Sequence, residues 1–177
     1  MSELCIPADL QRLKSGENFL LFDSGESDPE RYLMFGTLKN LTELSYAEHW
    51  FLDGTFSITP SLFEQLYTIH ATKHNKNIPL VYVLLTRKTE NLYTRVFNSL
   101  FDLNENLNPD SVMLDFELAA INAISSVFPN AVIKGCYFHL SKAIYRHIQG
   151  NPADVLYKND DDARTLLKSS QGTRVCS

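Results

Sequence analysis

The sequence has few of the features that mark membrane proteins, secreted disulfide-rich domains or strongly basic nucleic-acid binders. No run approaches the roughly 20 consecutive apolar residues of a membrane span, and the first residues lack the basic and apolar regions of a signal peptide. Only three cysteines occur in 177 residues. An odd number is no disulfide framework and agrees with a reducing compartment, so we expect an intracellular protein without a membrane partner.

An excess of basic residues is also missing. The net charge is −5 and the pI is near 5.5, whereas affinity for duplex DNA comes largely from Lys and Arg on phosphates. Any DNA binding would therefore need help from a metal ion, another domain or another chain. The 44% hydrophobic content suits a folded domain with a substantial core.

The hydrophobic pattern predicts an α/β domain with a mixed five-stranded sheet in the order β-β-β-α-β-α-β-α, flanked by helices and preceded by a β-hairpin/helix extension. We expect a tail over 1–17, the domain over 18–152, and a weak helical continuation with a disordered end over 153–177. The expected strands are 19–23 and 31–35 in the hairpin, then 50–56, 63–71, 78–86, 111–117 and 131–136; the expected helices are 37–49, 90–103, 120–128 and 138–149.

Asp53 is the first candidate functional residue, since it lies in the apolar run Trp50–Phe56. A buried carboxylate without a partner costs several kcal/mol, and a cation, hydrogen bonds or a metal ion relieve that cost. An Asp in a D-G turn is the competing interpretation. A second apolar run, Ser111–Glu117, carries Asp115. Two such aspartates on neighbouring strands would suit a divalent-metal site, and oxygen ligands favour Mg²⁺ or Mn²⁺.

Glu117 could add a third oxygen ligand, or it could simply favour the dipole of the helix that follows it. Cys136 and His139 form a C-x2-H pair, which is either a partial metal site or a buried Cys beside a helix-starting His. We expect no zinc, because no other Cys or His stands at persuasive spacing. Four basic residues could contact phosphate or could be solvated surface: Arg87, Lys88, Lys142 and Arg146.

Taken together, these motifs resemble the catalytic domain of Mutator-like (MULE) transposases. The similarity is carried by six segments in order, each unspecific alone: 52–56, 65–70, 79–82 with 89–93, 115–120, 128–131 and 135–139. It implies an RNase H-like fold of the DDE group, Mg²⁺- or Mn²⁺-dependent DNA cleavage and strand transfer, and a nuclear location. It also implies that Asp53 and Asp115 are the first two catalytic acids, and that Cys136 and His139 are the family's C-x2-H signature.

The sequence departs from the family pattern in one respect. The resemblance implies a third acid, a Glu beyond the C-x2-H helix, and no match to it is found before Ser177. We therefore expect a truncated core that has little activity alone, with transposon-end DNA, a full-length transposase or a second copy of the chain as partners. A non-enzymatic interaction module derived from such a core is the alternative, so whether the chain is an enzyme stays open.

Overall fold

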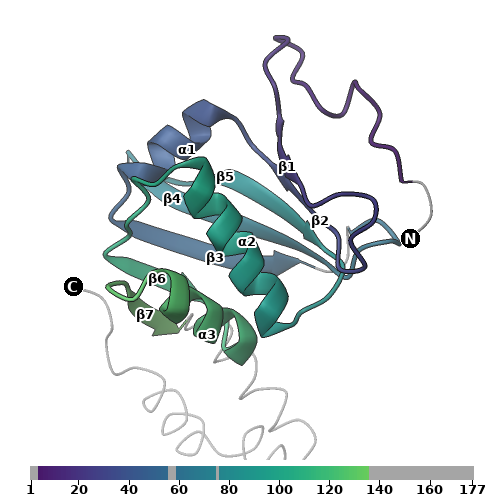
Figure 1. The fold of residues 1–177 in the computed structure, drawn as a ribbon. Coiled ribbons are helices and arrows are strands. Elements are labelled where there is room, and N and C mark those ends of the chain that lie inside the picture. The colour runs from purple at the N-terminus through teal and green to yellow at the C-terminus, as the bar shows by residue number, and fades with distance from the viewer. Residues whose placement is uncertain (1–3, 56–58, 75, 136–177) are drawn as a thin grey trace, which may run out of the picture. The chain divides into compact units, whose positions relative to one another are not determined.

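The computed structural model describes residues 4–55, 59–74 and 76–135. These residues form a mixed β-sheet with helices packed on one face (Figure 1). All of them except Gly135 belong to one compact unit, Met1–Lys134. Within these residues, no helix has both the length and the apolar character needed to cross a bilayer.

Three antiparallel strands form the centre of the sheet, as the sequence predicted. They are β3 (His49–Thr55), β4 (Gln65–Lys73) and β5 (Lys76–Leu85). The short strand β6 (Ser111–Leu114) lies on the other side of β3 and runs parallel to it. Next to β6 at the edge of the sheet is β7 (Val132–Gly135).

The N-terminal hairpin belongs to the same sheet. It consists of β1 (Leu20–Asp23) and β2 (Tyr32–Phe35), and β2 pairs antiparallel with β5. The sheet therefore has seven strands in the order β1-β2-β5-β4-β3-β6-β7, instead of the five that the sequence predicted. The physical reason is that β5 has an unpaired edge, and β2 satisfies the hydrogen-bonding groups there.

The helices begin where the sequence offers capping side chains. Thr37 precedes α1 (Leu38–Ser45), Thr89 precedes α2 (Glu90–Leu103), and each hydroxyl accepts a hydrogen bond from the backbone of the first turn. Helix α1 ends four residues before the predicted position, because His49 already belongs to β3. The indole Nε1 of Trp50 donates to the carbonyl of Leu44 at 3.2 Å and satisfies one of the groups left at the helix end.

The main core fills the space between the sheet and its helices. Strand β3 contributes Trp50 and Leu52 to this core, and these residues are 0% and 4% exposed. Helix α2 contributes its buried apolar side chains, and helix α3 (Leu118–Val127) packs beside α2. The α2 side chains in the core are Leu92, Tyr93, Val96, Phe97 and Leu100. Because strand side chains alternate between faces, the residues between these core positions point to the opposite face of the sheet.

A buried ion pair fastens the hairpin to the N-terminal segment. The Arg31 guanidinium donates to Asp23 through Nε at 2.8 Å and NH2 at 2.6 Å, and its NH1 donates to the Leu4 carbonyl at 2.9 Å. The Arg31 side chain is 3% exposed. The hydrogen bonds from Arg31 lower the pKa of Asp23.

We predict that Arg31→Met destabilises the fold by about 2 kcal/mol at pH 7, because it leaves a partly buried carboxylate without its cation. Since the pKa of Asp23 is lowered on folding, the pair stabilises the protein above the unfolded value of about 3.9 and stops doing so as pH falls through the folded value. Thermal unfolding from pH 7 to pH 2 measures this. Arg87→Met is the control, because the Arg87 side chain is 67% exposed and its contact with Glu30 is 3.9 Å long; an equal loss in both variants contradicts the prediction.

Candidate functional site

The pairing of β3 with β6 decides where the two candidate aspartates lie. In this parallel pair His49 is opposite Ser111, Trp50 opposite Val112 and Phe51 opposite Met113, a constant offset (111 − 49 = 62). Asp53 lies two residues further along β3, and the same offset leads to Asp115, which directly follows β6. Because neighbouring strands are about 4.8 Å apart, this register, continued for two residues beyond the last pair, predicts adjacent backbone positions for the two aspartates.

Both aspartates also share a face of the sheet. The core-facing residues are Trp50 and Leu52 on β3, and Val112 and Leu114 on β6. Alternation turns Asp53 and Asp115 to the opposite face, where both are half-buried. Asp53 is opposite Thr68 within the β3–β4 ladder, so the competing interpretation of a D-G turn is wrong.

A polar pair on β4 supports the backbone of Asp53. Thr68 Oγ1 donates to the Asp53 carbonyl at 3.2 Å and lies 2.8 Å from His70 Nε2. A hydroxyl has one proton, so both contacts are satisfied only when His70 donates from Nε2 to the Thr68 oxygen. Burial lowers the pKa of His70, and the charge of Asp53 opposes that shift. No local sequence pattern links His70 to this site, because its link to Asp53 depends on the antiparallel register.

The residue after Asp53 must be a glycine. A Cβ at Gly54 would lie 1.8 Å from Gln65 Nε2, and Gln65 is only 1% exposed. The Tyr93 hydroxyl donates to Gln65 Oε1 at 2.7 Å, which holds the amide against Gly54. This buried contact joins α2 to β4 next to the first aspartate.

Glu117 lies at the same end of the sheet. It occupies the N-cap position of α3, but its side chain makes no capping hydrogen bond. Burial raises the pKa of Glu117, and so does the charge of Asp115; the Tyr93 hydroxyl and the charge of Lys88 lower it. Glu117 is therefore near Asp115 and makes no capping hydrogen bond through its side chain.

Two of the predicted basic residues, Arg87 and Lys88, lie at this end of the sheet as well. Strand β5 runs parallel to β3, since both are antiparallel to β4. The loop that carries Arg87 and Lys88 thus leaves β5 at the end of the sheet where β3 and β6 also finish. Lys88 is close enough for its charge to affect the pKa of Glu117. Carboxylates and cations accordingly follow the carboxyl ends of three strands.

The other predicted site residues cannot be placed. Cys136, His139, Lys142 and Arg146 lie outside the described residues. Among the residues that the structure describes, no group of three or more His, Cys, Asp or Glu side chains is arranged to hold a metal ion. Asp53 and Asp115 carry carboxylate oxygens, the donor type that Mg²⁺ and Mn²⁺ prefer.

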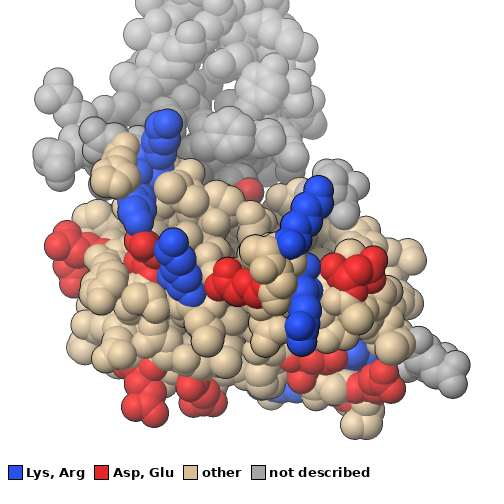
Figure 2. Space-filling view, turned by 90° about the horizontal axis from the view of Figure 1, so that it is seen from above, with Lys and Arg blue, Asp and Glu red and all other residues tan. Residues whose placement is uncertain are grey.

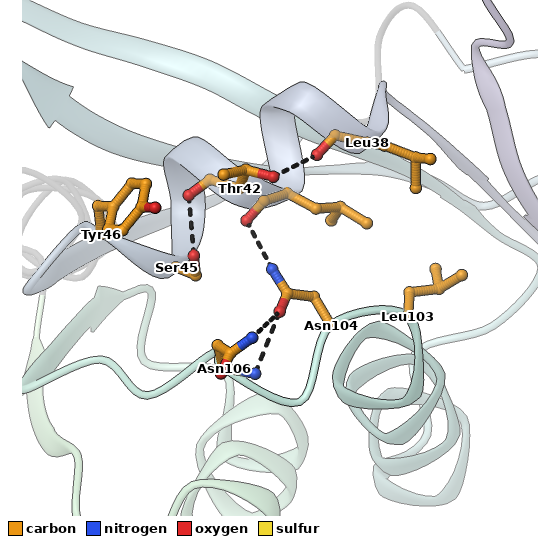
Figure 3. Close-up of a pocket in the computed structure, with 8 residues that line it drawn as sticks. Leu38, Thr42, Ser45, Tyr46, Leu103, Asn104 and Asn106 are labelled. Carbon is orange, nitrogen blue, oxygen red and sulfur yellow. Dashed lines mark hydrogen bonds between the residues drawn. The ribbon is translucent and has the colours of Figure 1, made fainter.

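The surface charges of the molecule are mixed. On the face seen in Figure 2, Lys and Arg side chains are interspersed with Asp and Glu and do not gather into a basic patch. A hollow of about 490 Å³ lies between α1 and the end of α2, lined in part by Tyr46, Leu103 and Asn104 (Figure 3). Helix α2 runs back across the sheet from the loop at Lys88, so this hollow is at the end opposite the carboxylates.

Together, the fold and the site define an α/β domain with an acidic pair at the carboxyl ends of two parallel strands. The family model of the MULE transposase domain matches residues 49–143, which is more than half of the chain and includes both aspartates. The chain belongs to the MULE transposase family. A comparison with curated proteins gives no match.

The Gly54 contact leads to a prediction about stability. Gly54→Ala should lower the thermal midpoint, because the new methyl group displaces Gln65 and breaks its hydrogen bond with Tyr93, a loss of about 1–3 kcal/mol. Gln65→Ala removes the obstruction, so the double variant should be more stable than the sum of the two single effects. A double-mutant cycle by chemical denaturation measures the coupling; strictly additive effects contradict the proposed clash.

The raised pKa of Glu117 leads to a second prediction. A carboxyl whose pKa is raised on folding stabilises the folded state below its unfolded pKa and loses that contribution as pH rises through the folded value. Glu117→Gln should therefore raise the thermal midpoint by a few degrees at pH 7.5 and have little effect at pH 4. The exposed residue Glu105 provides the control, Glu105→Gln; a benefit from Glu117→Gln that is independent of pH contradicts the assignment.

Proposed function

We propose that this domain is a DDE-type DNA transposase core, in which Asp53 and Asp115 hold divalent metal for DNA cleavage and strand transfer. The observation that supports this most directly is the register of β3 and β6, which gives the two aspartates adjacent positions on one face. Chain segments separated by about 60 residues meet there through strand pairing, and both carry the same ligand type.

We further infer that β3 to β7 form an RNase H-like core. The support is the order β5-β4-β3-β6-β7, with an antiparallel meander followed by a strand parallel to β3. In this interpretation the β1-β2 hairpin is an addition at the outer edge of β5. The family match covers β3 to β7 and excludes the hairpin, which agrees with that division.

The donor set fits Mg²⁺ or Mn²⁺. Two carboxylates at adjacent backbone positions repel each other in a partly desolvated place, and a bound cation removes that cost. When bound, such ions activate the attacking oxygen of a water or a 3′-hydroxyl and stabilise the leaving oxygen of the phosphodiester. The role of Asp53 and Asp115 is to orient carboxylate oxygens from the rigid strands β3 and β6.

Glu117 is a further carboxylate that we assign to this end of the sheet, distinct from the Glu that the family resemblance implies beyond residue 139. Its raised pKa reflects burial and the neighbouring charge of Asp115, and a cation between the two groups would reverse that effect by favouring the ionised form. We propose that Glu117 contributes an oxygen to the metal or to its bound water.

DNA is the proposed partner, and the nucleus is the location that follows from it. The net charge of −5 works against binding through phosphate contacts alone. We propose that Arg87 and Lys88 supply local positive charge beside the acidic pair, while bound metal neutralises the carboxylates.

We predict that millimolar Mg²⁺ or Mn²⁺ raises the thermal midpoint of the chain, because a ligand that binds only the folded state stabilises it. At ten times the dissociation constant the gain is about 1.4 kcal/mol. Asp53→Asn and Asp115→Asn should each abolish the shift. Asp110→Asn is the matched control, because Asp110 is exposed and precedes β6 at the opposite end of that strand.

The test measures metal binding instead of DNA cleavage. The family resemblance implies a Glu beyond residue 139 that is not assigned to a described residue, so we expect little cleavage by this chain alone. An unchanged midpoint in the wild type at all metal concentrations would contradict a metal-dependent function and favour the non-enzymatic interaction module. A shift that survives in both Asp variants would place the ion elsewhere.

A further inference from the structure

The turn of the β1-β2 hairpin lies beside the loop that carries Arg87. In the antiparallel pair β2–β5, Tyr32 is opposite Leu85, and the register is regular along the whole of β2. Continued for two residues beyond this pair, the register predicts that Glu30 lies opposite Arg87. The two side chains do meet there, since Arg87 Nε lies 3.9 Å from Glu30 Oε1. The fold therefore places these opposite charges side by side, as in a cross-strand pair.

Glu30 is held in place by the contacts of its neighbours in the turn. Asp28 Oδ1 accepts a hydrogen bond from the Glu30 backbone N–H at 3.0 Å, and the Asp28 carboxylate is itself paired with Arg95 on α2. The next residue, Arg31, is 2% exposed and donates to Asp23. The Glu30 carboxylate is therefore presented to Arg87 from a turn that is fixed on both sides.

Arg87, in contrast, is free to change its partner. Its side chain is 67% exposed, whereas that of Glu30 is 27% exposed. An exposed ion pair of this length contributes little to stability, so its loss does not unfold the hairpin. A guanidinium also binds phosphate, through two parallel hydrogen bonds to the phosphate oxygens. A phosphate can therefore replace Glu30 as the partner of Arg87 while the turn stays in place.

This contact bears on DNA binding because Arg87, with Lys88, is one of the two cations that we propose for phosphate contact. The net charge of −5 already opposes a polyanion, and the pairing with Glu30 neutralises one of the few positive charges at this end of the sheet. The acid comes from outside the region that matches the family model, since that region begins at residue 49. The hairpin thus adds a local competitor for phosphate.

We propose that the β1-β2 hairpin restrains DNA binding: Glu30 holds Arg87 in the free protein, and a DNA phosphate must displace Glu30 to contact Arg87. The proposal rests on the proposed function for its ligand, DNA. The phosphate in question is placed by Arg87 and not by the acidic pair. The restraint gives the hairpin a role in addition to extending the sheet beyond β5.

The test measures the affinity of the full chain for a fluorescein-labelled DNA duplex by fluorescence anisotropy, at low salt with millimolar Mg²⁺. Glu30→Gln removes the charge of the side chain and keeps its length. We expect this variant to bind about two- to fivefold more tightly than the wild type, which is the range that exposed ion pairs contribute. The reason is that DNA no longer has to break the pair with Arg87.

Two controls separate the pair from the general effect of charge. Arg87→Gln should weaken binding, and adding Glu30→Gln to it should give no further change, because no cation is left to release; this is a double-mutant cycle on DNA affinity. Glu26 is an exposed acid in the same turn. Glu26→Gln removes the same charge from the hairpin and should have a much smaller effect than Glu30→Gln.

The outcomes distinguish this inference from the proposed function. If the wild type does not bind the duplex, the proposed function and the restraint are both wrong. If the wild type binds, and Glu30→Gln gains no more than Glu26→Gln or gains as much without Arg87, the restraint is wrong and the proposed function stands. A clearly lower thermal midpoint in Glu30→Gln than in Glu26→Gln would show that the pair fastens the hairpin instead of exchanging with phosphate, and would also overturn the restraint.

Discussion

The parallel pairing of β3 with β6 is the constraint on which the site depends. It fixes an offset between two segments that are far apart in the sequence, and that offset gives Asp53 and Asp115 neighbouring positions. A slip of one residue would turn Asp115 to the opposite face of the sheet. The buried side chains of Trp50, Leu52, Val112 and Leu114 oppose such a slip, because it would expose them to solvent. The core therefore fixes the positions of the two acids along their strands.

Contacts around Asp53 also help to fix its position in β3. Gly54 lets the Gln65 amide approach β3, and Tyr93 on α2 holds that amide. On the other face, Thr68 donates to the Asp53 carbonyl and is itself contacted by His70. The backbone on both sides of the Asp53 carboxylate is thus fixed by neighbouring strands and by a helix. Such support would serve the role that we propose for Asp53, since small displacements of a reacting group are costly.

Much of this arrangement could be predicted from the sequence because it depends on residues that are close together in the chain. Thr89 and the apolar spacing that follows it predict α2 at its observed bounds, and the apolar runs around Asp53 and Asp115 predict the two strands. What the sequence did not reveal depends on pairing between distant segments. The addition of β2 to the edge of β5, the contact of Gln65 with Gly54 and the link from His70 to Asp53 each need a register that no local pattern encodes. Helix α1 was predicted too long because Tyr46 fits a helical apolar face, yet its side chain is 81% exposed.

The charge of the domain finally bears on the cofactor and the substrate that we propose for this end of the sheet. Folding brings Asp53, Asp115 and Glu117 to one edge, and burial raises the pKa of Glu117 there. This concentration of negative charge costs stability while no cation is present, and it repels the phosphates of DNA. A divalent ion changes the sign of both effects at once, because it compensates the carboxylates and attracts the phosphodiester. In the function that we propose, this acidic domain would therefore need metal at this end of the sheet before or together with the DNA.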